Sequence, residues 1–337
     1  SINLAHEGAR AGLAELLEQE ETRNVAAAAL VHSLQSSGDF IGLLDIVDAR
    51  LAVSDDPRKH AEILREAADI AEVQAEDNPA ALGFVNRLFP LEARDRVLED
   101  RMIRLAKAVG DWDGSLAAFA AAQEALGNDE FAVAQMRYRE AMLREQELGD
   151  APGALNCCLQ VIATQPDNHE AVGSTIRLAG PQGMWAEMTK AMLRYAEERD
   201  SIPYDLIGAM TGFADGESWA ALCDALSEQA AESKLSTRDQ AELHWRVAGW
   251  QLNHIGEGDA ATRSVQRSIQ LDNSRVDTLG SLAKLRAERR DMELYGTLRR
   301  LCEIDSGQLQ HFIDAAELAI EALDPESKQQ SLTALQG

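Results

Sequence analysis

The hydrophobic positions of this chain recur at helical spacing along nearly its whole length. Apolar residues fall three or four positions apart, as they do on one face of a helix. Examples are the stripes Leu13, Leu16 and Leu17; Leu43, Leu44, Val47 and Leu51; and Met102, Leu105, Ala106 and Val109. The eight prolines fall between such stripes or where a helix would begin. The pattern predicts an all-α protein.

The predicted helices follow from these stripes and from the prolines that separate them. Their ranges are 5–19, 22–37, 39–53, 57–76, 79–90, 93–109, 111–126, 129–148, 151–164, 168–180, 183–199, 203–214, 216–233, 236–255, 258–271, 274–289, 291–304, 307–323 and 326–335.

A short turn recurs after every second predicted helix. Its copies begin at residues 38, 76, 110, 149, 183, 217, 256 and 290, which are 34, 38 or 39 residues apart. The clearest copies read Gly38-Asp39-Phe40 and Gly110-Asp111-Trp112. Glycine permits the left-handed conformation that ends a helix, and aspartate can cap the next one. We expect the aromatic residue after the turn to fill the gap within its hairpin at Phe40, Trp112, Trp185 and Trp219.

A fixed period in this range predicts a solenoid, in which helical hairpins bury their apolar faces only by stacking on one another. Three hairpins, those that end near the turns at 76, 149 and 256, carry four or five extra residues. We expect these residues in a longer first helix or in the loop before it. Such an architecture favours a binding surface over a reaction.

Composition and charge narrow the choice of partner. The chain of 337 residues is 45% hydrophobic but only 5% aromatic, and its formal net charge is −25. That negative field disfavours nucleic acid and anionic membrane surfaces, and it would speed the encounter with a basic protein. No apolar stretch reaches the length of a membrane span, so we expect no membrane insertion. The absence of a signal peptide predicts a cytoplasmic location.

The sequence contains no complete motif for catalysis or metal binding. The run Gly256–Ala261 imitates a dinucleotide fingerprint, but a helix, not a strand, precedes it. His169-Glu170 lacks the second histidine of a zinc protease, because Gly173 stands in its place. The four cysteines have no zinc spacing and are expected to be buried and reduced: Cys157, Cys158, Cys223 and Cys302. We therefore expect no enzymatic activity, no cofactor and no metal.

The repeats resemble the tetratricopeptide repeat family. The best match is Trp245-x2-Ala248-Gly249-x2-Leu252, which is followed by Ala261, Val265, Ser268 and Asn273. The repeat before Pro166 offers Tyr138, Ala141, Ala154, Cys158 and Val161. The resemblance implies an α-solenoid of about nine helix-turn-helix units that forms a right-handed superhelix. It also implies that first helices line a concave groove.

The repeats suggest how the chain is organised. We expect a single tetratricopeptide-like array over 1–337, cut from a longer one, with a half-unit at 1–19. Residues 20–183 would form a first block, 184–217 an inserted single unit, and 218–337 a C-terminal block.

The resemblance also assigns residues to the groove. Carried onto two repeats of this chain, the groove positions predict the partner-binding residues Arg139, Leu143, Leu243, Arg246, Trp250 and His254. Trp250 is the strongest of these, because aromatic and arginine side chains dominate binding hot spots. The alternative is that Trp250 only packs against a neighbouring helix.

The leading functional hypothesis is a scaffold or adaptor that binds a peptide or protein in this groove. A second hypothesis is a structural subunit of a larger assembly, for example of bacterial motility or secretion machinery. A third is a helical enzyme or a sensor of a small ligand.

Overall fold

The computed structural model describes residues 7–273 and residue 280. Two compact units divide the chain, unit 1 over residues 1–160 and unit 2 over residues 161–337. No β-strand occurs in the described residues, so the all-α prediction is confirmed for them. The helices predicted after residue 273 lie outside the described residues.

The helices follow one another with short connections. They are α1 (Glu7–Leu17), α2 (Glu20–Ser37), α3 (Phe40–Asp45), α4 (Val47–Leu51), α5 (Pro57–Asp69), α6 (Asn78–Leu88), α7 (Arg96–Val109), α8 (Asp113–Leu126), α9 (Glu130–Gln146), α10 (Ala151–Thr164), α11 (His169–Ala179), α12 (Trp185–Arg199), α13 (Tyr204–Thr211), α14 (Ser218–Glu232), α15 (Thr237–Trp250) and α16 (Gly258–Leu271). Two π-helical segments extend α5 and α15, namely η1 (Ile70–Gln74) and η4 (Gln251–Ile255). Two 3₁₀ segments are η2 (Phe89–Glu92) and η3 (Gly180–Gln182).

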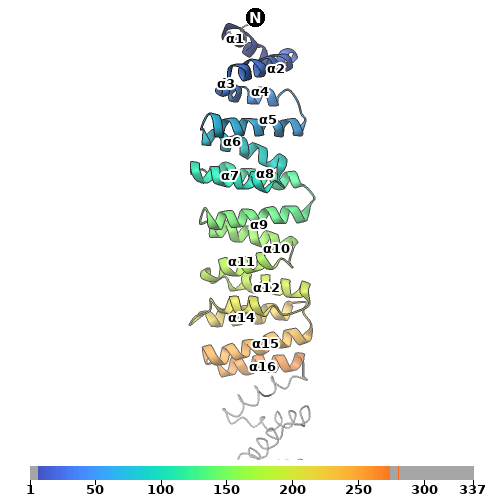
Figure 1. Cartoon of the computed structure of the whole chain (residues 1–337). Coiled ribbons are helices and arrows are strands. Elements are labelled where there is room, and N and C mark those ends of the chain that lie inside the picture. The colour runs from blue at the N-terminus through green and yellow to red at the C-terminus, as the bar shows by residue number, and fades with distance from the viewer. Residues whose placement is uncertain (1–6, 274–279, 281–337) are drawn as a thin grey trace, which may run out of the picture. The chain divides into compact units, whose positions relative to one another are not determined.

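Consecutive helices pair into hairpins within each unit. In unit 1, α2 precedes α3 and α4, α5 precedes α6, and α7 precedes α8 (Figure 1). Each hairpin also contacts the next one, since α6 packs on both α7 and α8. In unit 2, α11 contacts α13 and α12 contacts α14, so first helices lie on first helices and second helices on second helices. This stacking is that of an α-solenoid of helical hairpins, whereas the handedness of a superhelix stays a prediction.

The recurring turn has the conformation that its sequence predicts. Positive φ angles occur at its glycines: Gly38, Gly110, Gly149, Gly183 and Gly256. Asp39 accepts a hydrogen bond from the Gly42 amide at 3.0 Å, and Asp150 accepts one from the Gly153 amide at 2.9 Å. These bonds satisfy amides that the first helical turn leaves without partners. The predicted conformation is therefore confirmed at these five copies. Near residue 217 the glycine with positive φ is Gly216, at the weaker copy the left-handed residue is Glu76, and the copy at residue 290 lies outside the described residues.

One predicted helix is divided in the structure. The range 39–53 forms α3 and α4, which meet at Ile46, whose φ of −99° and ψ of 6° are not helical. The break lets the two halves bury side chains in different places. Leu43 joins an apolar cluster formed by α1 and α2, whereas Val47 joins the main core of unit 1.

The extra residues of the long hairpins lie in their first helices. The 13 residues of α5 continue into the five of η1, and the 14 of α15 continue into the five of η4. By comparison, α7 has 14 residues and α11 has 11. Each π segment takes up one residue of this surplus, because its hydrogen bonds span five residues instead of four.

Small side chains let the helices approach closely. The core of unit 1 contains many fully buried alanines, among them Ala68, Ala71, Ala81, Ala106 and Ala122. The rings of Phe89 and Phe119 meet edge to face inside it, with centroids 5.2 Å apart. These contacts supply the hydrophobic burial that holds the hairpins together.

Candidate functional site

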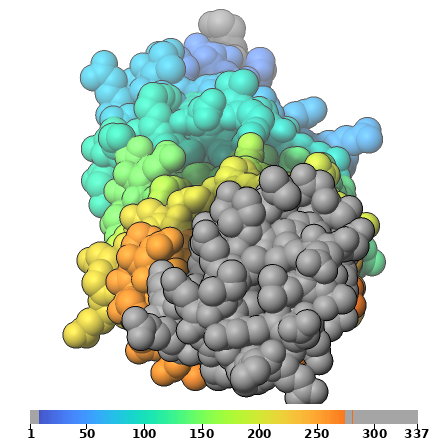
Figure 2. Space-filling view, turned by 90° about the horizontal axis from the view of Figure 1, so that it is seen from below, coloured from blue at the N-terminus to red at the C-terminus, as the bar shows by residue number. Residues whose placement is uncertain are grey.

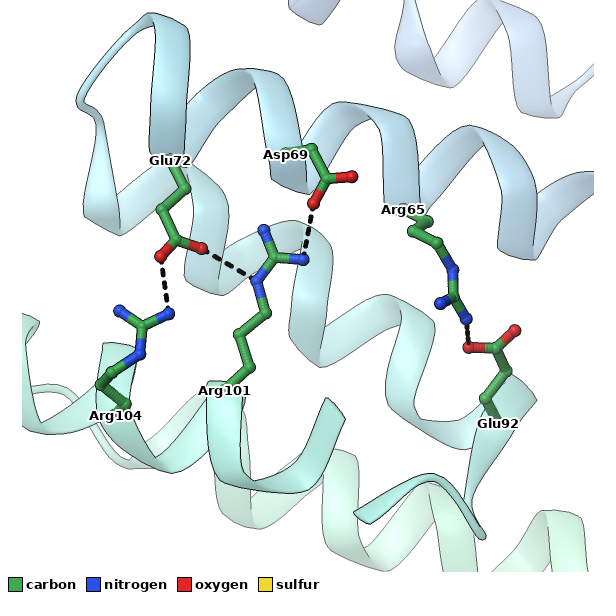
Figure 3. Close-up of polar contacts among 6 residues, drawn as sticks. All are labelled: Arg65, Asp69, Glu72, Glu92, Arg101 and Arg104. Atoms are coloured by element: carbon green, nitrogen blue, oxygen red, sulfur yellow. Dashed lines mark hydrogen bonds and ion pairs between the residues drawn. The ribbon is translucent and has the colours of Figure 1, made fainter. Parts of the chain in front are cut away.

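A row of polar contacts joins the first helices of unit 1. Arg101 of α7 contacts Asp69 of α5 and Glu72 of η1, each at 2.8 Å, and Arg104 binds Glu72 at 2.6 Å (Figure 3). We call the whole row the polar ladder. It comprises Gln35, Glu66, Asp69, Glu72, Glu99, Arg101, Arg104, Lys107, Arg139 and Glu147.

The centre of the polar ladder is held by opposite charges. Burial acts to raise the pKa of Glu72, but the hydrogen bonds and charges of Arg104 and Arg101 outweigh it and leave that pKa below its usual value. Glu72 is therefore a carboxylate near neutral pH, bound by two guanidinium groups. Such a contact fixes how neighbouring first helices align.

Arg139, one of the predicted partner-binding residues, belongs to the polar ladder. Its Nε lies 3.0 Å from Glu99 Oε2, and this nitrogen makes no hydrogen bond within the described residues. Burial raises the pKa of Glu99 and lowers that of Arg139, although each charge opposes the shift of the other. Arg139 thus neutralises a buried carboxylate and offers little surface to a partner.

The two predicted leucines lie in the interior. Leu143 of α9 is 4% exposed and belongs to the core of unit 1, and Leu243 of α15 is 1% exposed. Both side chains pack the hairpins and present almost no surface to a partner in this state. The groove positions taken from the family do not distinguish buried from exposed residues here, because α9 and α15 are covered on more than one side.

The other three predicted residues share one face of α15 and η4. Arg246, Trp250 and His254 are spaced four residues apart, which brings side chains to the same side of a helix. Together with Tyr204 and Trp219, which they contact, they form what we call the aromatic row.

Arg246 forms the end of the aromatic row nearest α13. Its guanidinium carbon lies 4.6 Å from the centre of the Tyr204 ring, and its Nε donates to Glu242 Oε1 at 2.7 Å. Tyr204 is 55% exposed. The guanidinium therefore lies over a ring that remains open to solvent, within the distance of a cation–π contact.

Trp219 links the other end of the aromatic row to α14. The ring of His254 stacks on the Trp219 ring with centroids 3.9 Å apart and an interplanar angle of 2°. Trp250 is tilted against the same tryptophan at 5.8 Å. The surface of α14, in yellow, adjoins that of α15 and α16, in orange (Figure 2). Trp219 thus joins two successive hairpins, beyond the role within its own hairpin that the turn predicts.

Unit 2 has two further polar features that involve histidines. His169 Nε2 lies 2.7 Å from Asp205 Oδ2, and hydrogen bonding to His169 is the main cause that lowers the pKa of Asp205. His244 of α15 is buried, and its Nε2 has no hydrogen-bond partner in the described residues. Burial lowers the pKa of His244, and the charge of Arg267 lowers it further.

Sequence reasoning missed Tyr204 and the contact that Trp219 makes with the next hairpin. The spacing of Arg246, Trp250 and His254 was visible in the sequence, but their contacts come from other helices. No local pattern indicates those contacts.

Three further features of the described residues concern metal ligands, thiols and hydrophobic helices. No group of three or more potential metal ligands lies together in residues 7–273. Burial raises the pKa of Cys157 to about 11 and that of Cys158 and Cys223 to about 12, so these thiols are poor nucleophiles. No helix in the described part of the chain has the length and hydrophobicity required to cross a membrane.

Comparisons with known proteins add little to this description. No protein-family model matches the chain, and no curated protein matches it. The structure of Naa15/Naa10 bound to HypK-THB is similar over 98% of this chain and 54% of that chain, with 12% identity and a TM-score of 0.29. The crystal structure of yeast Tom70 is similar over 98% of this chain and 95% of its own, with 12% identity and a TM-score of 0.25. Scores this low leave the fold to be argued from the helices themselves.

Proposed function

We propose that this protein is a scaffold that binds a protein or peptide partner through the aromatic row of unit 2. The observation that carries the proposal is the exposed Tyr204 ring with the guanidinium of Arg246 held over it. Tyrosine, tryptophan and arginine are the side chains that most often dominate binding energy at protein interfaces. The aromatic row places all three types on adjoining helices.

The charge of the chain favours a basic partner and disfavours nucleic acid. A formal net charge of −25 attracts positively charged proteins over a distance set by the salt concentration. The three cysteines in the described residues are buried and form no disulfide, which fits a reducing compartment such as the cytoplasm. The proposal assigns no reaction to the protein. Arg139, Leu143 and Leu243 support the hairpins, while Arg246, Trp250 and His254 remain the residues proposed to meet the partner.

Partner capture tests this function. The full chain is immobilised and incubated with a native lysate from its source, and bound proteins are identified by mass spectrometry. We expect specific partners on the wild-type chain and their loss on the double variant Tyr204→Ala/Arg246→Ala. The matched control is Arg87→Ala in unit 1, which removes an exposed arginine paired with Asp48. Equal capture by both variants would remove the aromatic row as the binding surface.

A further inference from the structure

A hollow with an apolar floor lies in unit 1, apart from the aromatic row. Its volume is about 500 Å³, and α2, α3, α5 and η1 contribute its lining. Leu43 and Ile70 are buried beneath it, and the ring of Phe40 is 39% exposed at its side. An aromatic ring left open above buried aliphatic side chains can pack against a further apolar group.

Acidic side chains stand around this floor. Glu62, Glu66 and Asp69 line the hollow and come from one face of α5, since their spacing is that of successive helical turns. The one basic residue of the lining, Arg65, directs its guanidinium to Glu92 in η2 and is neutralised there (Figure 3).

The acids differ in how far their charge is already balanced. Glu66 accepts hydrogen bonds from Arg50 and Gln35. Asp69 binds Arg101 through Oδ1 at 2.8 Å, whereas its Oδ2 has no hydrogen bond in the part of the chain that the structure describes. Glu62 is exposed and makes no hydrogen bond or ion pair among those residues. The hollow therefore keeps net negative charge beside its apolar floor.

We propose that this hollow binds a lysine or arginine of a basic partner segment that carries an apolar residue next to the cation. The aliphatic stem of the basic side chain packs on Phe40, and its charged end reaches Glu62 and Asp69 Oδ2. Long basic side chains bury their stems in this manner while their charge stays hydrated or paired. The proposal rests on the proposed scaffold function and adds a second contact surface with stated chemistry.

A titration with synthetic peptides tests the hollow directly. The probe is a short fluorescent peptide of alternating lysine and leucine. One matched peptide has serine for leucine, and another has glutamate for lysine. Anisotropy is measured with the full chain at about 0.15 M salt, where long-range attraction is screened. We expect the lysine–leucine peptide to bind most tightly and the glutamate peptide not to bind.

Two charge-reversal variants distinguish binding in the hollow from attraction by the net charge of the chain. Glu62→Lys is expected to weaken the lysine–leucine peptide about tenfold. The control, Glu228→Lys on α14, changes net charge by the same amount on an exposed residue outside the hollow, and it should alter affinity by less than about twofold. Phe40→Ser should also weaken binding, with thermal unfolding measured to confirm that it folds.

Three outcomes would overturn the proposal. The first is an equal loss of peptide affinity in Glu62→Lys and Glu228→Lys. The second is equal affinity for the lysine–serine and lysine–leucine peptides. The third is no binding of either of these peptides. The partner-capture experiment distinguishes failure of the hollow from failure of the scaffold function. If partners depend on Tyr204 and Arg246 but not on Glu62, only the hollow fails; if the wild-type chain captures none, the scaffold function fails.

Discussion

Unit 1 and unit 2 join neighbouring hairpins with different side chains. In unit 1, charged residues of the polar ladder connect α5 to α7 and α7 to α9. In unit 2, an arginine lies over a tyrosine between α13 and α15, and a tryptophan joins α14 to η4. Ion pairs align helices, but the charges that form them are neutralised by one another. The aromatic row instead leaves ring surface exposed at Tyr204, so the same kind of hairpin is joined by paired charges in one unit and by partly open rings in the other.

The largest expected effect comes from replacing one arginine in each unit by methionine. Arg139→Met leaves the buried Glu99 with only the more exposed Arg96, 3.3 Å away, as an ion-pair partner, and should lower the free energy of unfolding by about 2–3 kcal/mol. Arg246→Met removes a more exposed contact and should cost about 1 kcal/mol or less. Hydrogen exchange in α7 and α9, compared with α13 and α15, measures both effects.

The double variant Glu99→Gln/Arg139→Met serves as the control for this pair. It removes the buried charge together with its partner and should recover more than half of the loss. If Arg246→Met lowered the free energy of unfolding more than Arg139→Met does, the expected difference between the two units would be wrong.

A smaller effect is expected from adding one methyl group to a glycine in each unit. A Cβ atom on Gly180 would lie 2.4 Å from the Phe213 ring, so Gly180→Ala should destabilise unit 2 by about 1–3 kcal/mol. In unit 1, a Cβ on Gly83 of α6 would have no atom within 4 Å. Gly83→Ala should therefore stabilise its helix by up to about 1 kcal/mol. Thermal unfolding of the two variants measures the difference, and an equal shift of both in one direction would contradict it.

The smallest expected effect concerns acid sensitivity. His244 has a folded-state pKa below its usual 6.5, so the unfolded chain takes up a proton first as the pH falls. The stability that neutral His244 provides is therefore present above about pH 6.5 and is lost as the pH drops from there towards the folded-state pKa. Carboxylates of unit 1 with lowered pKa values, such as Glu72, lose their contribution only below about pH 4.5.

The variant His244→Leu isolates this effect. After correction for the slower intrinsic exchange at lower pH, protection of the α15 amides should fall between about pH 7 and pH 5.5 in the wild-type chain and change less in the variant. The same change in both proteins would show that other groups cause it.

Helix positions could be predicted from the sequence because they depend on local signals. Prolines, the glycine of each turn and the aspartate that follows it act within a few residues of where they stand. The break at Ile46 could not be predicted in this way. It arises because Leu43 and Val47 are buried in two different clusters, and the cluster that a residue joins depends on helices distant in sequence.

The candidate site was predictable only in part, for a similar reason. Helical spacing places Arg246, Trp250 and His254 on one face, but it does not show which neighbouring helices cover that face. The resemblance also assigned Leu143 and Leu243 to the groove, but other helices bury their side chains. The polar ladder was missed because each of its contacts joins residues that lie about 30 or 40 positions apart.

The π segments that end α5 and α15 hold one residue more than an α-helical turn of the same rise. The Ala75 amide bonds back to the Ile70 carbonyl at 3.0 Å, and the Gly256 amide bonds to that of Gln251. Deleting a single residue within either segment would convert it to a regular α-helical turn ahead of the left-handed residue that follows, which is Glu76 after η1 and Gly256 after η4. At these two positions a hairpin can therefore gain or lose a residue, so that hairpins of unequal length arise while their neighbours stay stacked.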